Sequence, residues 1–216
     1  MKEKISKILL DKNAVTLNTE EPYTYVSGIR SPIYCDNRVL TFYPKERKLI
    51  SNAFAKLVKQ LDIDVIAGTA SSAISWAAWV AAKLEKPMVY IRKKSKDYGK
   101  ERLIEGGDIK NKRVVVIEDL ISTGGSSMNA VNACREAGAE VIAMIAIFTY
   151  EFDKSKKLFE EGKCRTLFLT GFTTLVNVAA ENNFLGKDKL GLVHEWSKDP
   201  SGWGPKHGFQ LGDKKN

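Results

Sequence analysis

The stretch VVVIEDLISTGGSS, residues 114–127, decides the fold. It contains an unbroken apolar run, two adjacent acids, and a loop of hydroxyl residues and glycines that leads into a helical pattern. A continuous apolar run is typical of a strand that is buried on both faces, as in parallel sheets covered by helices. We therefore expect residues 114–117 to form a central strand and residues 126–137 to form the helix that follows it.

The same alternation extends over most of the chain. Short apolar runs at residues 65–67, 88–91, 141–148 and 167–169 alternate with helical patterns, one of which begins at Pro44. The other helices are expected at residues 73–84 and 173–182. This order predicts an α/β fold with an open, mostly parallel sheet and helices on both faces.

The first 43 residues do not follow this alternation. Residues 1–13 have an amphipathic, charged helical pattern, and residues 15–43 read as short strands and turns that form a small hood over a site. We expect one domain over residues 1–216, with the N-terminal helix and hood in residues 1–43 and the core and C-terminal extension in residues 44–216. The tail from Trp203 is polar and glycine-rich, so a loose tail is predicted.

Composition limits the class of protein. Of the 216 residues, 44% are hydrophobic and 28% are charged, which is typical of globular proteins. The net charge of +8 comes from basic residues spread along the chain, so it is compatible with an anionic small substrate as well as with nucleic acid. The three cysteines are far apart and only two histidines occur, a pattern that predicts neither a zinc site nor disulfides. We expect a cytoplasmic protein without a membrane or nucleic-acid partner.

The acids and the glycine loop within residues 118–127 suggest a specific ligand. Glycines and small hydroxyl residues let backbone N–H groups approach an anion, and the helix beginning near Ser126 adds further donors, so this loop is predicted to hold a phosphate. Glu118 and Asp119 are suited to accept hydrogen bonds from vicinal ribose hydroxyls. Together these groups describe a ribose 5-phosphate site. The alternative is a purely structural turn with solvated acids.

Neither of two common nucleotide-binding patterns is present in this run. It lacks the GxxxxGK pattern of a P-loop and the GxGxxG pattern of a dinucleotide site. A nicotinamide-dependent oxidoreductase is therefore disfavoured.

A second segment, RKKSKDYGK at residues 92–100, is strongly cationic. It lacks apolar periodicity and lies between two predicted strands, which indicates a long loop. Alone, it would be interpreted as a solvated charge run. Its position one strand before the acidic pair suggests instead a lid whose cations stabilise a departing anion in the transition state.

These motifs together resemble those of a known family. Residues 114–127 resemble the phosphoribosyl diphosphate signature of type I phosphoribosyltransferases, and residues 92–100 resemble the catalytic loop of the orotate-specific members. SGIRSPIYCDNR, residues 27–38, is similar to a stretch of the same members. The resemblance implies transfer of ribose 5-phosphate from phosphoribosyl diphosphate to orotate in pyrimidine biosynthesis. It also implies Mg²⁺ carried by substrate oxygens, without dedicated protein ligands, and a homodimer in which the loop of residues 92–100 reaches the partner's site.

The resemblance implies roles for individual residues. Catalytic roles fall on Lys96, Arg92 and Asp119, and orotate contacts fall on Ser122, Tyr34 and Cys35. Tyr98 stands where the family has a histidine, and tyrosine does not titrate near neutral pH. The implied contacts to phosphoribosyl diphosphate are Arg92, Lys93, Lys96, Tyr98, Glu118, Asp119, Leu120, Ile121, Ser122, Thr123, Gly124, Gly125 and Ser126.

One loop departs from the family pattern. After the strand at residues 65–67 the family shows a sequence resembling GxATAGIPxA or GPAYKGIP, whereas this chain has GTASSAISWA at residues 68–77. We expect altered diphosphate binding here, unless the bulky Trp76 packs into a dimer interface. Other acceptor bases, such as xanthine, hypoxanthine or uracil, and a nucleic-acid-binding regulator on the same fold remain alternatives.

Overall fold

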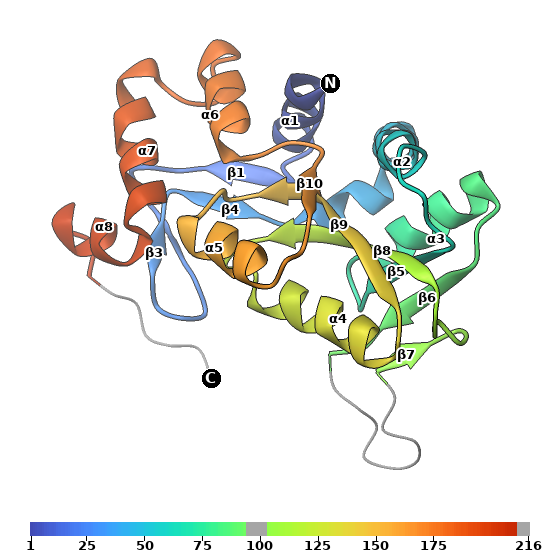
Figure 1. Ribbon diagram of the computed structural model, residues 1–216. Coiled ribbons are helices and arrows are strands. Elements are labelled where there is room, and N and C mark those ends of the chain that lie inside the picture. Colours follow the sequence, from blue (N-terminus) through green and yellow to red (C-terminus); the bar gives the residue numbers. More distant parts are fainter. Residues whose placement is uncertain (94–102, 211–216) are drawn as a thin grey trace.

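The chain is organised around a six-stranded sheet (Figure 1). The computed structural model describes residues 1–93 and 103–210, and Lys96 and Tyr98 therefore lie outside the described residues. The strand order is β10-β9-β8-β5-β6-β7, and every pair is parallel except β6 with β7. The strands are β5 (Val65–Thr69), β6 (Met88–Ile91), β7 (Ile104–Glu105), β8 (Arg113–Ile121), β9 (Glu140–Thr149) and β10 (Thr166–Phe168).

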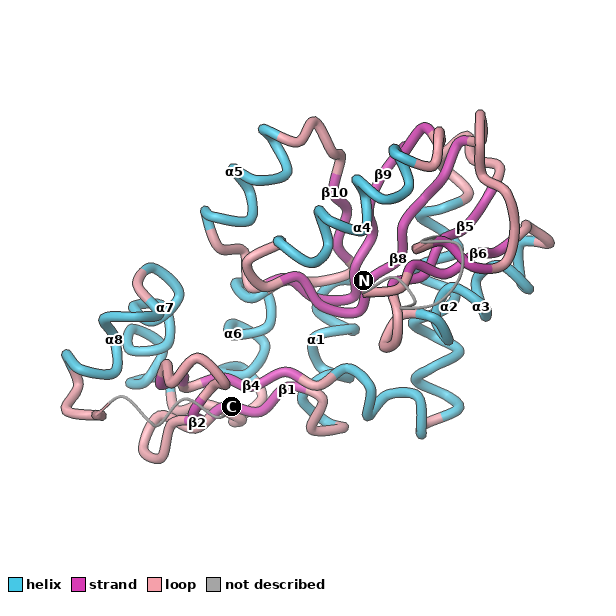
Figure 2. The backbone as a smooth tube through the Cα atoms, turned by 90° about the horizontal axis from the view of Figure 1, so that it is seen from below, coloured by secondary structure: helices cyan, strands magenta, loops and turns pink. Residues whose placement is uncertain are grey.

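Helices cover both faces of this sheet, as Figure 2 shows. One face packs against α1 (Lys2–Asp11), α2 (Pro44–Val58), α3 (Ile74–Leu84) and α6 (Phe172–Glu181), and the other against α4 (Gly125–Glu136) and α5 (Asp153–Glu161). Successive residues of β8 divide between the two cores: Val115 and Ile117 face the first, and Val114 and Val116 face the second. This alternation explains why residues 114–117 of the strand are all apolar. The predicted fold class is confirmed.

The hood consists of two small antiparallel sheets and a 3₁₀ helix. Strand β1 (Val15–Leu17) pairs with β4 (Ile33–Cys35), and β2 (Tyr23–Thr24) pairs with β3 (Arg30–Ser31). The helix η1 (Asn37–Phe42) follows β4 directly, with Asp36 accepting a hydrogen bond from its first turn. Helix α1 packs against α6, where the buried hydroxyls of Ser6 and Thr170 lie 2.6 Å apart. Helix α1, which directly precedes the hood, is thus fixed to the face of the sheet that carries α6.

The acids lie inside a strand rather than after one. The apolar run predicted a strand ending at Ile117, but β8 continues to Ile121 because its pairing with β9 continues to that residue. The pairing of β8 with β5 ends at Ile117. Glu118 and Asp119 therefore occupy a part of β8 that has a neighbouring strand on one side.

The prediction of a loose tail from Trp203 is wrong for the described residues up to 210. Helix α7 (Leu190–Lys198) follows the short η2 (Lys187–Lys189), and α8 (Pro200–Lys206) comes next. Asp199 caps α8 by accepting a hydrogen bond from Gly202, and the Trp203 side chain is 1% exposed. Its indole N–H donates to the Leu192 carbonyl at 2.9 Å. One buried indole thus anchors a segment whose composition is otherwise polar.

Trp76 also differs from expectation. It is completely buried within this chain, where its ring packs against Phe54 and Trp79 at centroid distances of 6.4 and 5.1 Å. The suggestion that Trp76 packs into a dimer interface is therefore wrong. Its ring belongs to the core between α2, α3 and the sheet.

Replacing Trp203 with alanine should lower the free energy of unfolding by about 3–5 kcal/mol, because the substitution leaves a cavity where the buried indole was. Urea denaturation followed by circular dichroism measures this change. Phe42→Ala is the matched control, since Phe42 is 80% exposed and its loss should change stability by less than about 0.5 kcal/mol. Equal effects of the two substitutions would contradict the packing of α8.

Candidate active site

A cavity of about 530 Å³ opens at the carboxyl ends of β5, β6 and β8. Ligands of open parallel sheets bind at this end. Residues of the segment around η1 close one wall, and the start of α4 closes another. The cavity brings together Cys35, Arg92, Lys93, Glu118, Asp119, Leu120, Ser122, Thr123, Gly124 and Ser126 from the sequence-based prediction.

Five other predicted residues lie elsewhere or outside the described part of the chain. Ile121 is buried at 1% exposure, and neither Ile121 nor Gly125 lines the cavity. Tyr34 is 44% exposed and its ring lies beside that of Tyr23, while its neighbour Cys35 reaches the cavity wall. Lys96 and Tyr98 belong to residues 94–102, which the structure does not describe.

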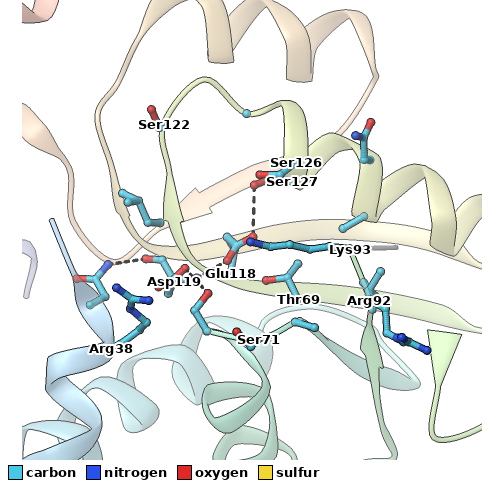
Figure 3. A pocket seen from close by; sticks show the side chains of 18 of the residues that line it. Arg38, Thr69, Ser71, Arg92, Lys93, Glu118, Asp119, Ser122, Ser126 and Ser127 are labelled. Atoms are coloured by element: carbon cyan, nitrogen blue, oxygen red, sulfur yellow. Dashed lines mark hydrogen bonds between the residues drawn. The ribbon is translucent and has the colours of Figure 1, made fainter. Parts of the chain in front are cut away.

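The loop between β8 and α4 has the geometry of an anion cradle. Gly124 has a φ of +84°, and a Cβ at this position would lie 3.0 Å from the Phe159 ring, so glycine is required here. Helix α4 begins at Gly125 directly after this turn. The hydroxyls of Ser122 and Ser126 lie above the acidic pair in Figure 3. A helix N-terminus and neighbouring hydroxyls offer hydrogen-bond donors to a phosphate.

Glu118 is the more deeply buried of the two acids. Its side chain is 8% exposed, accepts a hydrogen bond from the Asp119 N–H at 2.9 Å, and lies 3.5 Å from the Ser127 hydroxyl (Figure 3). Burial, followed by the influence of the neighbouring Asp119, raises the pKa of Glu118 to about 8. Glu118 therefore retains its proton at neutral pH in the substrate-free site and can donate as well as accept hydrogen bonds.

Asp119 is half-buried and is contacted by residues from other segments. Its carboxylate accepts a hydrogen bond from the Ser72 hydroxyl at 2.9 Å. Its backbone carbonyl accepts one from the Asn37 amide at 2.7 Å. The acidic end of β8 is thus joined both to the loop after β5 and to the hood.

The basic residues at the cavity have different surroundings. Arg38 forms a two-point ion pair with Asp36, with N–O distances of 2.6 and 2.8 Å. Arg92 lies 3.5 Å from Glu105, and in Figure 3 its guanidinium points away from Glu118 and Asp119, whereas Lys93 extends towards them. Arg92 is thus oriented away from the acids of its own chain.

Several cavity residues were not assigned individually from the sequence. They are Asp36, Asn37, Arg38, Thr69, Ala70, Ser71, Ser72, Ser127 and Asn129. Asp36, Asn37 and Arg38 belong to residues 27–38, in which the family resemblance assigns contacts only to Tyr34 and Cys35. Residues 69–72 belong to the loop at residues 68–77, where altered diphosphate binding was expected without a role for any single residue, and such loops meet at one edge of the sheet.

Comparison with known proteins identifies the class. Residues 40–178 match a family model described as the phosphoribosyl transferase domain. The orotate phosphoribosyltransferase of Listeria innocua is 47% identical over 206 residues, which cover 94% of this chain and 99% of the relative. That of Enterococcus faecalis is 48% identical over 204 residues, covering 94% of this chain and 97% of the relative. The chain therefore belongs to the orotate phosphoribosyltransferase family.

A solved structure supports the fold. The orotate phosphoribosyltransferase of Aeropyrum pernix superposes with a TM-score of 0.72 at 24% identity, covering 84% of this chain and 99% of that one. Among the described residues, no helix is both long and apolar enough to cross a membrane.

The raised pKa of Glu118 makes stability depend on pH. Between about pH 5 and pH 8 the unfolded chain has lost this proton while the folded chain keeps it, so Glu118 reduces stability as the pH rises. Glu118→Gln should therefore gain unfolding free energy relative to the unsubstituted protein, by up to about 1.4 kcal/mol per pH unit over this range.

Chemical denaturation near pH 5 and near pH 8 measures this difference. Glu160→Gln is the control, because Glu160 is an exposed glutamate on α5. A Glu118→Gln advantage that stays constant with pH would contradict a buried, protonated Glu118.

Proposed function

We propose that this chain transfers ribose 5-phosphate from phosphoribosyl diphosphate to orotate, giving orotidine 5′-monophosphate and diphosphate. In this proposal residues 1–216 act as one domain. Family membership makes it a pentosyltransferase of pyrimidine biosynthesis. The observation that carries the assignment to this cavity is the placement of a glycine and hydroxyl loop and two acids at its walls. These groups complement the two ends of a ribose 5-phosphate.

The proposed substrate position follows from the described walls. The 5-phosphate would bind the loop of residues 122–126, with backbone N–H groups and hydroxyls as donors. The ribose hydroxyls would meet Glu118 and Asp119 at the opposite end. Leu120, Ile121 and Gly125 would contribute through the shape of the backbone. Orotate would lie between Ser122 and the backbone at Tyr34 and Cys35.

Catalysis in this arrangement is mainly positioning and electrostatic stabilisation. As the bond at C1 changes partners, positive charge develops on the ribose and negative charge on the leaving diphosphate. The Asp119 carboxylate would favour the former, with Glu118 holding the ribose hydroxyls, and the cations Arg92, Lys93 and Lys96 would neutralise the latter, with Tyr98 as a hydrogen-bond donor. Orotate is already acidic, so its nitrogen needs no strong base.

Mg²⁺ is proposed as the metal. No group of three or more His, Cys, Asp or Glu side chains that would suit a metal occurs among residues 1–93 and 103–210. Mg²⁺ usually binds through substrate phosphates, waters and one or two carboxylates rather than in a protein cage. Diphosphate and ribose oxygens would hold the ion. When bound, the ion neutralises charge on the diphosphate.

The proposed working form is a cytoplasmic homodimer in which the loop of residues 92–100 of one subunit reaches the site of the other. The orientation of Arg92 away from Glu118 and Asp119 supports this sharing, because its guanidinium does not point at the ribose end of its own cavity. Small anionic substrates also account for a basic chain without a nucleic-acid partner.

Purified protein with Mg²⁺, phosphoribosyl diphosphate and orotate should consume orotate and release diphosphate, and Asp119→Asn should reduce turnover at least tenfold because it removes a charge that stabilises the transition state. Ultraviolet absorbance of orotate measures consumption. Mixtures lacking one component are the controls. Consumption of xanthine, hypoxanthine or uracil in place of orotate would overturn the choice of base while retaining the ribose phosphate site.

Mixing Lys96→Ala subunits with Asp119→Asn subunits should restore activity above that of either variant, because each mixed dimer would contain one site with both residues intact. Random exchange gives up to about a quarter of the unsubstituted activity per site. Native mass spectrometry confirms that mixed dimers form. Mixed dimers without restored turnover would contradict a shared site.

A further inference from the structure

Asp119 is held at two points by side chains from outside its own strand. The Ser72 hydroxyl donates to its Oδ1 at 2.9 Å, and the Asn37 Nδ2 donates to its backbone oxygen at 2.7 Å. Ser72 belongs to the loop between β5 and α3, and Asn37 begins η1 in the hood. Two segments that are far apart in sequence thus converge on one residue of the cavity.

The contact from Asn37 replaces a missing strand neighbour. The pairing of β5 with β8 ends at Gly68 and Ile117, two residues before Asp119. Asn37 is 1% exposed, and its amide group reaches the Asp119 carbonyl that lies beyond this last pair. Its Oδ1 is buried without a hydrogen-bond partner among the described residues. Burying the unpaired Oδ1 reduces stability. The Asn37 amide is therefore explained by its Nδ2, which donates to the Asp119 carbonyl.

The contact from Ser72 orients the carboxylate itself. Ser72 is half-buried at the cavity wall, and its hydroxyl bond restrains the rotation of the Asp119 side chain. In the two family patterns quoted above, aligned on Gly68, an alanine (GxATAGIPxA) or a lysine (GPAYKGIP) stands at this position, where this chain has Ser72. The hydroxyl is thus a feature of this chain's departing loop.

We propose that Ser72 and Asn37 are positioning residues that hold Asp119 ready for the ribose hydroxyls, Ser72 through the carboxylate and Asn37 through the main chain. This inference rests on the proposed function. A carboxylate already held in place loses little further freedom when the ribose binds, so affinity for the ribose increases. Neither side chain needs to contact the substrate.

A different role for Ser72 makes the opposite prediction. The loop after β5 lines the same cavity, and in this alternative role the Ser72 hydroxyl donates directly to the diphosphate. In that case its removal weakens binding of inorganic diphosphate. Under the positioning role, its removal weakens binding of ribose 5-phosphate, which contains the hydroxyls that face Asp119.

Titration calorimetry with ribose 5-phosphate and, separately, with inorganic diphosphate and Mg²⁺ distinguishes these roles. Ser72→Ala should raise the dissociation constant for ribose 5-phosphate about fivefold, the effect of one lost hydrogen bond, and leave that for diphosphate within about twofold. Ser72→Thr, which keeps the hydroxyl, should restore the affinity for ribose 5-phosphate. Ser75→Ala is the matched control, because Ser75 lies on α3 outside the cavity.

Asn37→Leu removes the amide at similar volume and should also weaken ribose 5-phosphate binding, with Asn52→Leu on the exposed face of α2 as its control. In turnover assays both positioning variants should raise KM for phosphoribosyl diphosphate several-fold and leave KM for orotate within about twofold. Thermal unfolding checks that Asn37→Leu folds, and Ser72→Ala decides the question if it does not.

Unchanged ribose 5-phosphate affinity in Ser72→Ala, or a loss confined to diphosphate, would overturn the proposal. Ribose 5-phosphate binding requires no acceptor base, so this result is separate from the identity of the base. Failure of orotate turnover with intact ribose 5-phosphate binding would count against the proposed function alone.

Discussion

The site depends on the unequal lengths of two neighbouring strands. Strand β8 is paired with β9 as far as Ile121, whereas its pairing with β5 ends at Ile117. Because β5 stops early, the chain turns away through residues 70–73 and leaves a hollow beside the last part of β8. Glu118 and Asp119 lie on this part, held straight by β9 on one side and open to the cavity on the other. If β5 continued alongside β8, its backbone would fill the space that the cavity occupies.

Sequence patterns predicted the sheet well because residues 114–117 of β8 and 141–148 of β9 are continuous apolar runs, and two buried faces leave little choice of structure. The sequence patterns failed where a single tertiary contact determines the local structure. The polar residues around Trp203 predicted a loose tail, yet one indole and the cap from Asp199 order α8. The bulk of Trp76 suggested an interface, but a helix side chain's direction depends on how the helix rotates against the sheet, and this rotation is not visible in the local sequence.

For the site residues, too, local patterns were predicted from the sequence and tertiary contacts were not. The acids and the glycine loop form one continuous stretch whose chemistry is local, and the structure brings most of it together in the cavity. Asn37 and Ser72 meet Asp119 only because the hood and the loop after β5 converge there, which requires the tertiary structure. A polar residue in such a loop carries no periodic signal that separates it from a solvated one. Local chemistry was therefore predictable, and contacts between distant segments were not.

The packing of α8 on β3 gives the hood a dependence on residues far along the chain. A Cβ on Gly204 would lie 2.8 Å from the Cβ of Arg30, and the Arg30 guanidinium donates to the Gln210 carbonyl at 3.0 Å. During synthesis on the ribosome, all residues of the sheet and of α4 are synthesised before residues 200–210. The β2–β3 hairpin therefore gains its contacts with α8 and Gln210 only after these residues have been synthesised. The hood is thus the last part of the site to obtain all its packing contacts.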